Sequence, residues 1–154
     1  MTDAARLPDT QDIVLDETFP HAPAVLWRAL TDGELIGRWL MQPKGFAAVT
    51  GNRFTYQTTP AGAWDGVIRC EVLEVRPNER LVYSWSGGDA GNVGYGSQLD
   101  TVVSWTLSPV GSGTRLQLIH AGFVRAVNDV AFQNMSDGWT KVLGRLDTLV
   151  RSLN

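Results

Sequence analysis

Hydrophobic residues alternate with polar ones through the middle of the chain and then change to helical spacing near its end. Between residues 44 and 123, apolar side chains recur at every second position in several short segments, a pattern typical of strands with one buried face. Residues 137–153 instead carry apolar side chains at intervals of three and four, close to the helical period of about 3.6 residues. This stripe comprises Trp139, Val142, Leu143, Leu146, Leu149, Val150 and Leu153. A long amphipathic helix that follows half-buried strands is expected to cover the apolar face of their sheet.

The alternation predicts two antiparallel hairpins. Strands at 64–75 and 80–86 flank the turn-forming run 76–79. Their shared apolar face comprises Ile68, Cys70, Val72, Leu81, Tyr83 and Trp85. Strands at 99–107 and 114–120 flank the Pro- and Gly-containing segment 109–113, and their predicted facing pairs are Trp105 with Leu116, Val103 with Leu118, and Thr101 with His120. Each hairpin then has an apolar and a mainly polar face, as in a sheet that is solvated on one side.

The N-terminal third predicts one strand and two short helices. Residues 1–11 offer little to bury and are expected to be a loose lead-in to a single domain over residues 12–154. A strand is predicted at 12–19, and Pro20 ends it. Helices are predicted from Ala22, with Pro23 in the first turn, and from Glu34 to Leu40. The order of these elements indicates an α+β fold.

Several short strings resemble a known family. They are FPHAP at 19–23, VLWRALTD at 25–32, Trp39, TRLQL at 114–118, HAGF at 120–123, and Gly138-Trp139 with Leu143 and Leu146. Their order is similar to the START-like, helix-grip (SRPBCC) superfamily, and to its branch related to the C-terminal domain of the heat-shock-protein-90 ATPase activator. The resemblance implies a curved antiparallel sheet around a long C-terminal helix, with two short helices after the first strand. Because the superfamily includes lipid carriers, cyclases, receptors and co-chaperone domains, the fold alone does not give the activity.

Composition and charge exclude several classes of function. The 154 residues carry a net charge of −3 with no basic run, which argues against binding to nucleic acid or an anionic membrane. The single cysteine, Cys70, excludes an internal disulfide and is expected to be a buried inert thiol. With two histidines, a His/Cys metal site is not expected, and no cofactor is predicted. The chain has no long apolar run or signal-peptide core, so a cytoplasmic location is expected.

The candidate site is an aromatic cavity between the sheet and the C-terminal helix. The side chains expected to line it are Trp39, Tyr83, Trp85, Trp105, His120, Trp139 and Leu143. Aromatic rings supply apolar area with a polar edge that orients a ligand, although the same rings also suit plain core packing. His120 is expected to point toward the cavity; the alternative is a hydrogen bond to Thr101 or to a backbone carbonyl. The glycine-rich segment 87–97 is predicted to be a flexible loop at the cavity mouth, with Tyr95 as a lid residue.

Three functions are compatible with these features. The first is binding of a small hydrophobic or aromatic molecule in the cavity. The second, which the resemblance implies, is a protein-interaction domain that acts on a chaperone. The third is a cyclase or hydrolase that uses His120 and a tyrosine in the same cavity. The absence of a convergent acid and base in the sequence favours binding over catalysis. Both a monomer and a homodimer joined through a strand edge remain compatible with the sequence.

Overall fold

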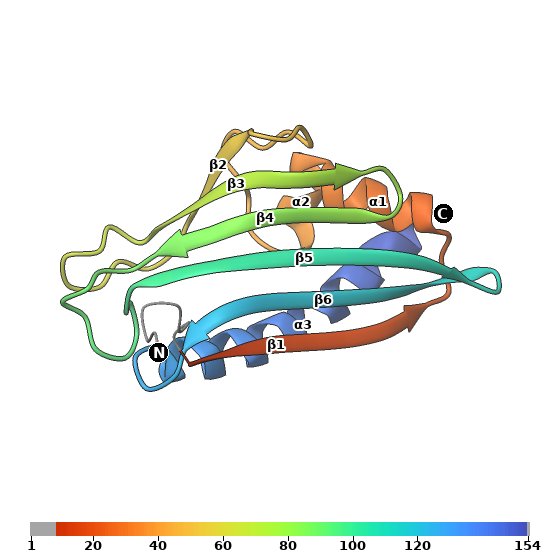
Figure 1. The fold of residues 1–154 in the computed structure, drawn as a ribbon. Helices are drawn as coiled ribbons and strands as arrows, with labels where there is room; N and C mark the ends of the chain where they lie inside the picture. Colours follow the sequence, from red (N-terminus) through yellow and green to blue (C-terminus); the bar gives the residue numbers. More distant parts are fainter. Residues whose placement is uncertain (1–8, 154) are drawn as a thin grey trace, which may run out of the picture.

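A computed structural model of the protein describes residues 9–153, which form one antiparallel sheet and three helices (Figure 1). The elements are β1 (Thr10–Phe19), α1 (Pro23–Thr31), α2 (Gly33–Trp39), β2 (Arg53–Gln57), β3 (Val67–Arg76), β4 (Arg80–Gly87), β5 (Leu99–Val110), β6 (Gly113–Val124) and α3 (Asp129–Leu153). Of the predicted lead-in, residues 1–8 lie outside the described part of the chain. Thr10 and Gln11 belong to β1, so this strand begins before residue 12.

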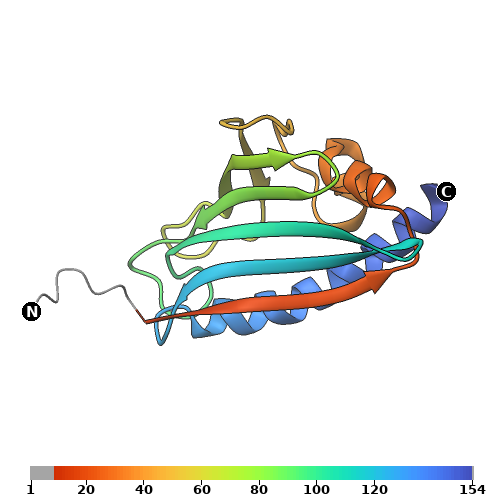
Figure 2. The same cartoon turned by 45° about the vertical axis from the view of Figure 1, so that its right-hand side comes forward.

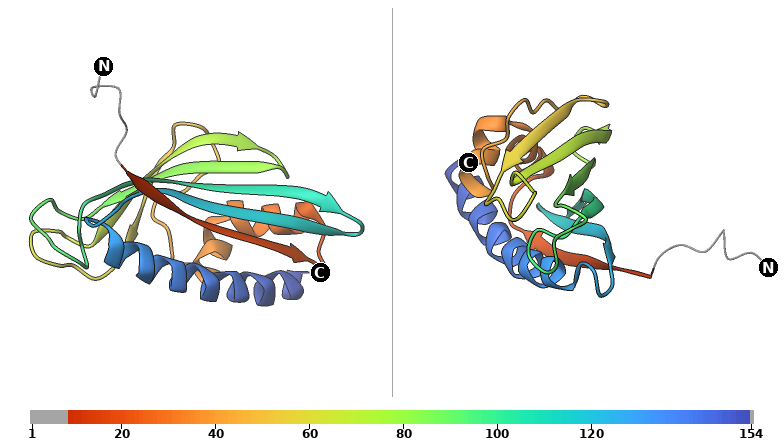
Figure 3. Two further views of the ribbon diagram at one scale, coloured as in Figure 1. Left: turned by 60° about the horizontal axis from the view of Figure 1, so that its bottom comes forward. Right: turned by 90° about the vertical axis from the view of Figure 1, so that its left-hand side faces the viewer.

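The six strands form a single curved sheet in the order β1-β6-β5-β4-β3-β2. The sheet bends around α3, which lies along its concave face (Figure 3). Helices α1 and α2 close the end near the C-terminus of α3, and the long loops lie at the opposite end, beside the start of α3 (Figure 2). This arrangement confirms the predicted α+β helix-grip fold.

The strand registers confirm one predicted hairpin and correct the other. In the β3–β4 pair, Arg69 faces Ser86 as predicted, and a bulge at Leu73 then shifts the pairing by one residue. In the β5–β6 pair, Trp105 faces Leu118, so the predicted register was wrong by two residues. The strands extend as far as Val110 and Gly113, and a tight turn with Gly111 at φ 57° replaces the longer loop. A shift of two residues keeps every side chain on its face, which is why the predicted inward set is still buried.

The helices begin and end close to the residues predicted from the sequence, except at the start of α3. Pro23 opens α1, and the Asp32 carboxylate caps α2 by accepting hydrogen bonds from the Glu34 and Leu35 amides at 2.9 and 3.2 Å. Helix α3, however, begins at Asp129 rather than at residue 137. Its first turns bury little apolar surface, so the hydrophobic stripe that predicts the helix is weak there.

The core fills the space between the concave face of the sheet and the C-terminal half of α3. Val103, Leu116 and Leu118 of the sheet and Leu146 and Val150 of the helix are completely buried. Helices α1 and α2 complete this core, and the Trp39 indole of α2 donates a hydrogen bond to the Ala29 carbonyl at 2.9 Å. Among residues 9–153, no helix has the length and apolar character needed to cross a membrane.

Candidate ligand-binding site

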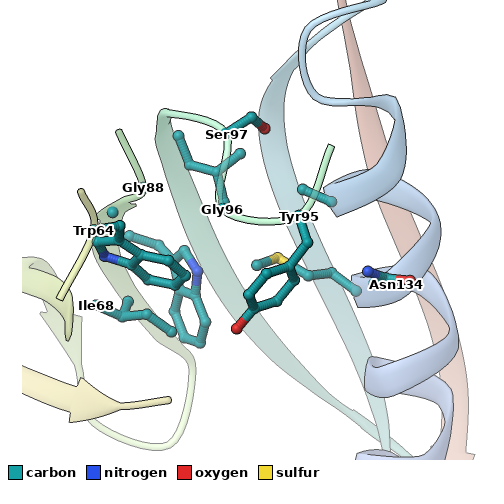
Figure 4. A pocket seen from close by; sticks show the side chains of 12 residues that line it. Trp64, Ile68, Gly88, Tyr95, Gly96, Ser97 and Asn134 are labelled. Carbon is teal, nitrogen blue, oxygen red and sulfur yellow. The ribbon is translucent and has the colours of Figure 1, made fainter. Parts of the chain in front are cut away.

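A cavity lies beside the N-terminal half of α3, at the end of the sheet where the long loops meet. Its inner chamber, of about 50 Å³, is partly enclosed (Figure 4). Its outer chamber, of about 300 Å³, is more open. The two chambers adjoin, because they share the lining residues Trp64, Ile68, Trp85, Tyr95, Asn134 and Met135. The outer chamber is comparable with the smaller ligand sites of proteins, which begin at about 300 Å³.

One face of α3 forms the helical wall of this cavity. Ala131, Asn134, Met135, Gly138, Val142 and Arg145 follow one another at helical spacing and line one or both chambers. At Gly138, an added Cβ atom would meet nothing within 4 Å, so this glycine leaves open space rather than allowing a close packing contact. Trp139 lies next to it and adds its ring to the outer chamber.

The sheet contributes Trp85 to both chambers. Its side chain is buried, and its ring lies 5.6 Å from Tyr56 and 5.7 Å from Trp139, measured between centroids. The indole nitrogen of Trp85 is buried and has no hydrogen-bond partner among residues 9–153. Because an indole N–H can only donate, the group that would satisfy it is a hydrogen-bond acceptor.

Two loops close the cavity at its far end, and we call them the strap: residues 58–66 and 88–98. The Tyr95 hydroxyl donates a hydrogen bond to the Thr59 carbonyl at 2.7 Å, and the Asn92 amide donates to the Ala61 carbonyl at 2.8 Å. The rings of Trp64 and Tyr95 are neighbours, with 5.9 Å between their centroids (Figure 4). Tyr95 therefore lies at the cavity wall; its movement as a lid stays a prediction.

His120 lies in the core, where both of its ring nitrogens have partners. The Trp139 indole donates to Nδ1 at 3.0 Å, so Nδ1 is the acceptor and Nε2 carries the proton. Nε2 then donates to the Thr101 hydroxyl at 2.7 Å, and that hydroxyl donates to the Trp85 carbonyl at 2.7 Å. Burial lowers the pKa of His120 to about 3, so the ring is neutral. The predicted alternative, a hydrogen bond to Thr101, is thus present, and His120 holds the ring of Trp139 in place.

The seven side chains predicted for the site fall into two groups. Trp85 and Trp139 line the cavity. The others lie in the core and are not among the lining residues of either chamber: Trp39, Tyr83, Trp105, His120 and Leu143. Within that group, the Trp105 indole donates to the Tyr83 hydroxyl at 3.1 Å, so these two polar edges satisfy each other. Contact between any of the seven and a ligand stays a prediction.

Sequence reasoning missed several residues of the cavity wall. The most prominent are Met41, Trp64, Ile68, Asn134, Met135 and Arg145. Asn134 and Met135 continue the spacing of Val142 toward the N-terminus, so extending the helix to Asp129 would have revealed them. Arg145 lies within the predicted helix, but as a charged residue it is not part of the apolar stripe. Trp64 had no such signal, because its position depends on how the strap folds.

The lining of the cavity is mainly apolar and aromatic. Its lining residues include no carboxylate or imidazole. Its polar groups are the indoles of Trp64, Trp85 and Trp139 and the side chains of Thr58, Tyr95, Ser97, Asn134 and Arg145. Within the described part of the chain, no three His, Cys, Asp or Glu side chains are placed to hold a metal ion. Burial raises the pKa of the Cys70 thiol to about 12, as expected for an inert cysteine.

Comparison with known structures gives several relatives of the same fold. Protein MLL2253 from Mesorhizobium loti is 34% identical, with a TM-score of 0.79 over 94% of this chain and 99% of its own. CalU16 from Micromonospora echinospora is 26% identical, with a TM-score of 0.70 over 92% of this chain and 76% of its own. DynU16, from the dynemicin biosynthetic locus, is 24% identical with a TM-score of 0.70 and is similar in fold alone; the alignment covers 94% of this chain and 48% of DynU16.

The sequence was also compared with family profiles and with curated proteins. No curated protein matches. The profile of the family described as "Activator of Hsp90 ATPase homolog 1-like protein" matches residues 20–151, from the end of β1 to the last turn of α3. The match confirms the resemblance inferred from the sequence strings. The chain belongs to the Activator of Hsp90 ATPase homolog 1-like protein family, within the START-like helix-grip superfamily.

Proposed function

We propose that this protein binds a small apolar or aromatic molecule that carries a hydrogen-bond acceptor, in the cavity between α3 and the strap. The observation that carries the proposal is the wall of Trp64, Trp85 and Trp139, in which the buried Trp85 N–H lacks a partner among residues 9–153. A buried donor without an acceptor costs about 1–3 kcal/mol, which a ligand carbonyl or ether oxygen would recover. The fold supports the proposal, because helix-grip proteins commonly bind hydrophobic ligands.

Two glycines of α3 provide a matched test of the site. Gly138 faces the cavity and Gly144 faces solvent, and an added Cβ meets nothing within 4 Å at either position. Leucine at either position should raise the free energy of unfolding by up to about 1 kcal/mol, because glycine is a poor helix former. We expect only Gly138→Leu to reduce binding, since its side chain would occupy the outer chamber.

The measurement is a fluorescence titration with phenylnaphthylamine, a neutral aromatic probe, on wild type and both variants. We expect saturable binding by wild type and Gly144→Leu, and a loss of at least about tenfold in affinity for Gly138→Leu, equivalent to about 1.4 kcal/mol. If wild type and Gly138→Leu bind the probe equally, the ligand site is elsewhere and the proposal is wrong.

Trp85→Phe tests the acceptor, because it keeps an aromatic ring and removes the N–H donor. We expect this variant to bind acetylnaphthalene about fivefold more weakly than wild type, the equivalent of one hydrogen bond of about 1 kcal/mol. Ethylnaphthalene has a similar shape without the acceptor and serves as the control for the change in ring size. Equal losses for both compounds would show that Trp85 contributes shape alone.

A further inference from the structure

Resting on the proposed function, we infer that the natural ligand is an apolar acid whose anionic group binds Arg145 at the cavity mouth. Arg145 lines the outer chamber and also the neighbouring surface hollow. It is exposed, and it has no ion pair or hydrogen bond with any other residue in the range 9–153. Its guanidinium is therefore available at the boundary between the apolar cavity and solvent.

Most other arginines of the protein, unlike Arg145, form an ion pair with a carboxylate. Ion pairs within 4 Å join carboxylates to Arg38, Arg53, Arg69, Arg76, Arg80, Arg115, Arg125 and Arg151. Of the arginines in the described part of the chain, only Arg28 and Arg145 lack such a pair. Arg28 lies in the last turn of α1, where a positive charge is favourable next to the helix C-terminus. Arg145 lies in the middle of α3 and has no comparable structural role.

The charges around Arg145 add to its positive potential. The residues three and four positions away on α3 are Lys141, Val142, Thr148 and Leu149, and none is acidic. Lys141 and Arg38 line the same surface hollow as Arg145. The Glu34 carboxylate in this region is paired with Arg38 at 3.4 Å. Because Glu34 already compensates Arg38, Lys141 is the side chain that adds positive charge to that of Arg145 in this hollow beside the cavity.

This geometry indicates a ligand with an apolar body at one end and an anionic group at the other. The rings of Trp64, Trp85 and Trp139 would enclose an aromatic or branched hydrocarbon body. A carboxylate, sulfate or phosphate at the other end would accept hydrogen bonds from the planar guanidinium of Arg145, which suits such groups. A neutral ligand would bury the same apolar area and leave Arg145 to water.

Two fluorescent probes separate the anion from the apolar body. Anilinonaphthalene sulfonate and phenylnaphthylamine have the same aromatic body, and only the first carries a sulfonate. We expect Arg145→Gln to weaken binding of the sulfonate about threefold to fivefold, as for an exposed charge pair, and to leave phenylnaphthylamine unchanged. Arg151→Gln removes the same charge from the same helix, away from the cavity, and should change neither titration. Added salt should weaken binding of the sulfonate alone, and it should do so less in Arg145→Gln than in wild type.

The outcomes separate this inference from the proposed function. If wild type binds both probes equally and Arg145→Gln changes neither affinity, the cavity binds neutral molecules and the inference is overturned. If Arg145→Gln and Arg151→Gln weaken the sulfonate equally, the effect is general electrostatics, and the inference is again overturned. If wild type binds neither probe, or Gly138→Leu binds both as wild type does, the proposed function fails together with the inference.

Discussion

At the scale of single residues, one chain of hydrogen bonds positions two tryptophans that line the cavity, Trp85 and Trp139. The proton donors run in one direction, from the Trp139 indole to His120, from His120 to Thr101, and from Thr101 to the Trp85 carbonyl. Every polar atom of this chain is buried and satisfied, so the network fixes the rotamer of Trp139 and the backbone of Trp85 at a low energetic cost. The two lining tryptophans are thus held by a histidine that need not touch the ligand.

This network predicts a loss of stability at mildly acidic pH. The pKa of His120 is about 3 in the folded protein and about 6.5 in the unfolded chain, so the unfolded chain binds one more proton between these values. The free energy of unfolding therefore falls as the pH drops below about 6.5, by about 2 kcal/mol at pH 5 from this residue.

Urea denaturation of wild type and His120→Gln at about pH 7.5 and about pH 5 measures this contribution. The decrease between the two pH values should be about 2 kcal/mol larger in wild type, because the two proteins differ only at residue 120. Equal decreases in the two proteins would mean that His120 is already able to ionise in the native state.

At the scale of elements, α3 has two halves with different roles. From Val142 onward its apolar stripe packs into the core, where Leu143, Leu146 and Val150 are almost completely buried. Its first turns face the cavity and are attached to the rest of the fold through Asn128. The Asn128 side chain accepts a hydrogen bond from the Val124 amide at 2.9 Å and donates to the Ser97 hydroxyl and the Gln98 carbonyl at 3.0 and 2.9 Å. This residue connects β6, α3 and the strap.

Asn128→Ala should therefore destabilise the protein strongly. The substitution leaves the Val124 amide, the Ser97 hydroxyl and the Gln98 carbonyl without this partner, and we expect a loss of about 2–4 kcal/mol. Asn134→Ala on the next turns of the helix is the control, because its exposed side chain should change stability by less than about 0.5 kcal/mol. Thermal or urea unfolding of both variants measures the difference, and similar losses would show that Asn128 does not anchor the helix.

At the scale of the whole molecule, the space between the sheet and α3 is packed differently at its two ends. At the end closed by α1 and α2, rings and aliphatic side chains fill the interior; an example is the edge-to-face contact of Trp39 and Trp105 at 5.5 Å. At the other end, the strap and the start of α3 enclose open space instead. The chaperone-binding and enzymatic alternatives stay predictions, and no cluster of acid and base side chains among the lining residues supports the second.

This asymmetry predicts where a ligand changes local stability. A bound molecule contacts the strap and the first turns of α3, so it should slow amide hydrogen exchange at residues 58–66, 88–98 and 129–142. Exchange in β1 and in the last turns of α3 should change little. Hydrogen-exchange mass spectrometry with and without phenylnaphthylamine measures both regions. Protection confined to the outer face of the sheet would place the probe at a different site.

The sequence by itself determined the fold of this protein, since periods of two and about 3.6 are local properties that each segment carries regardless of its neighbours. It also determined which face of each strand is buried, because a register error of two residues leaves the faces unchanged, as in the β5–β6 hairpin. Tertiary structure alone decided which aromatic rings pack together and which face the cavity. Trp105 and Trp85 have the same inward pattern in sequence. Trp105 nevertheless pairs with Tyr83 in the core, whereas Trp85 lines the cavity and its buried N–H has no partner among residues 9–153. That difference depends on how the strap and the start of α3 meet, and contacts between segments so far apart leave no periodic signal in the chain.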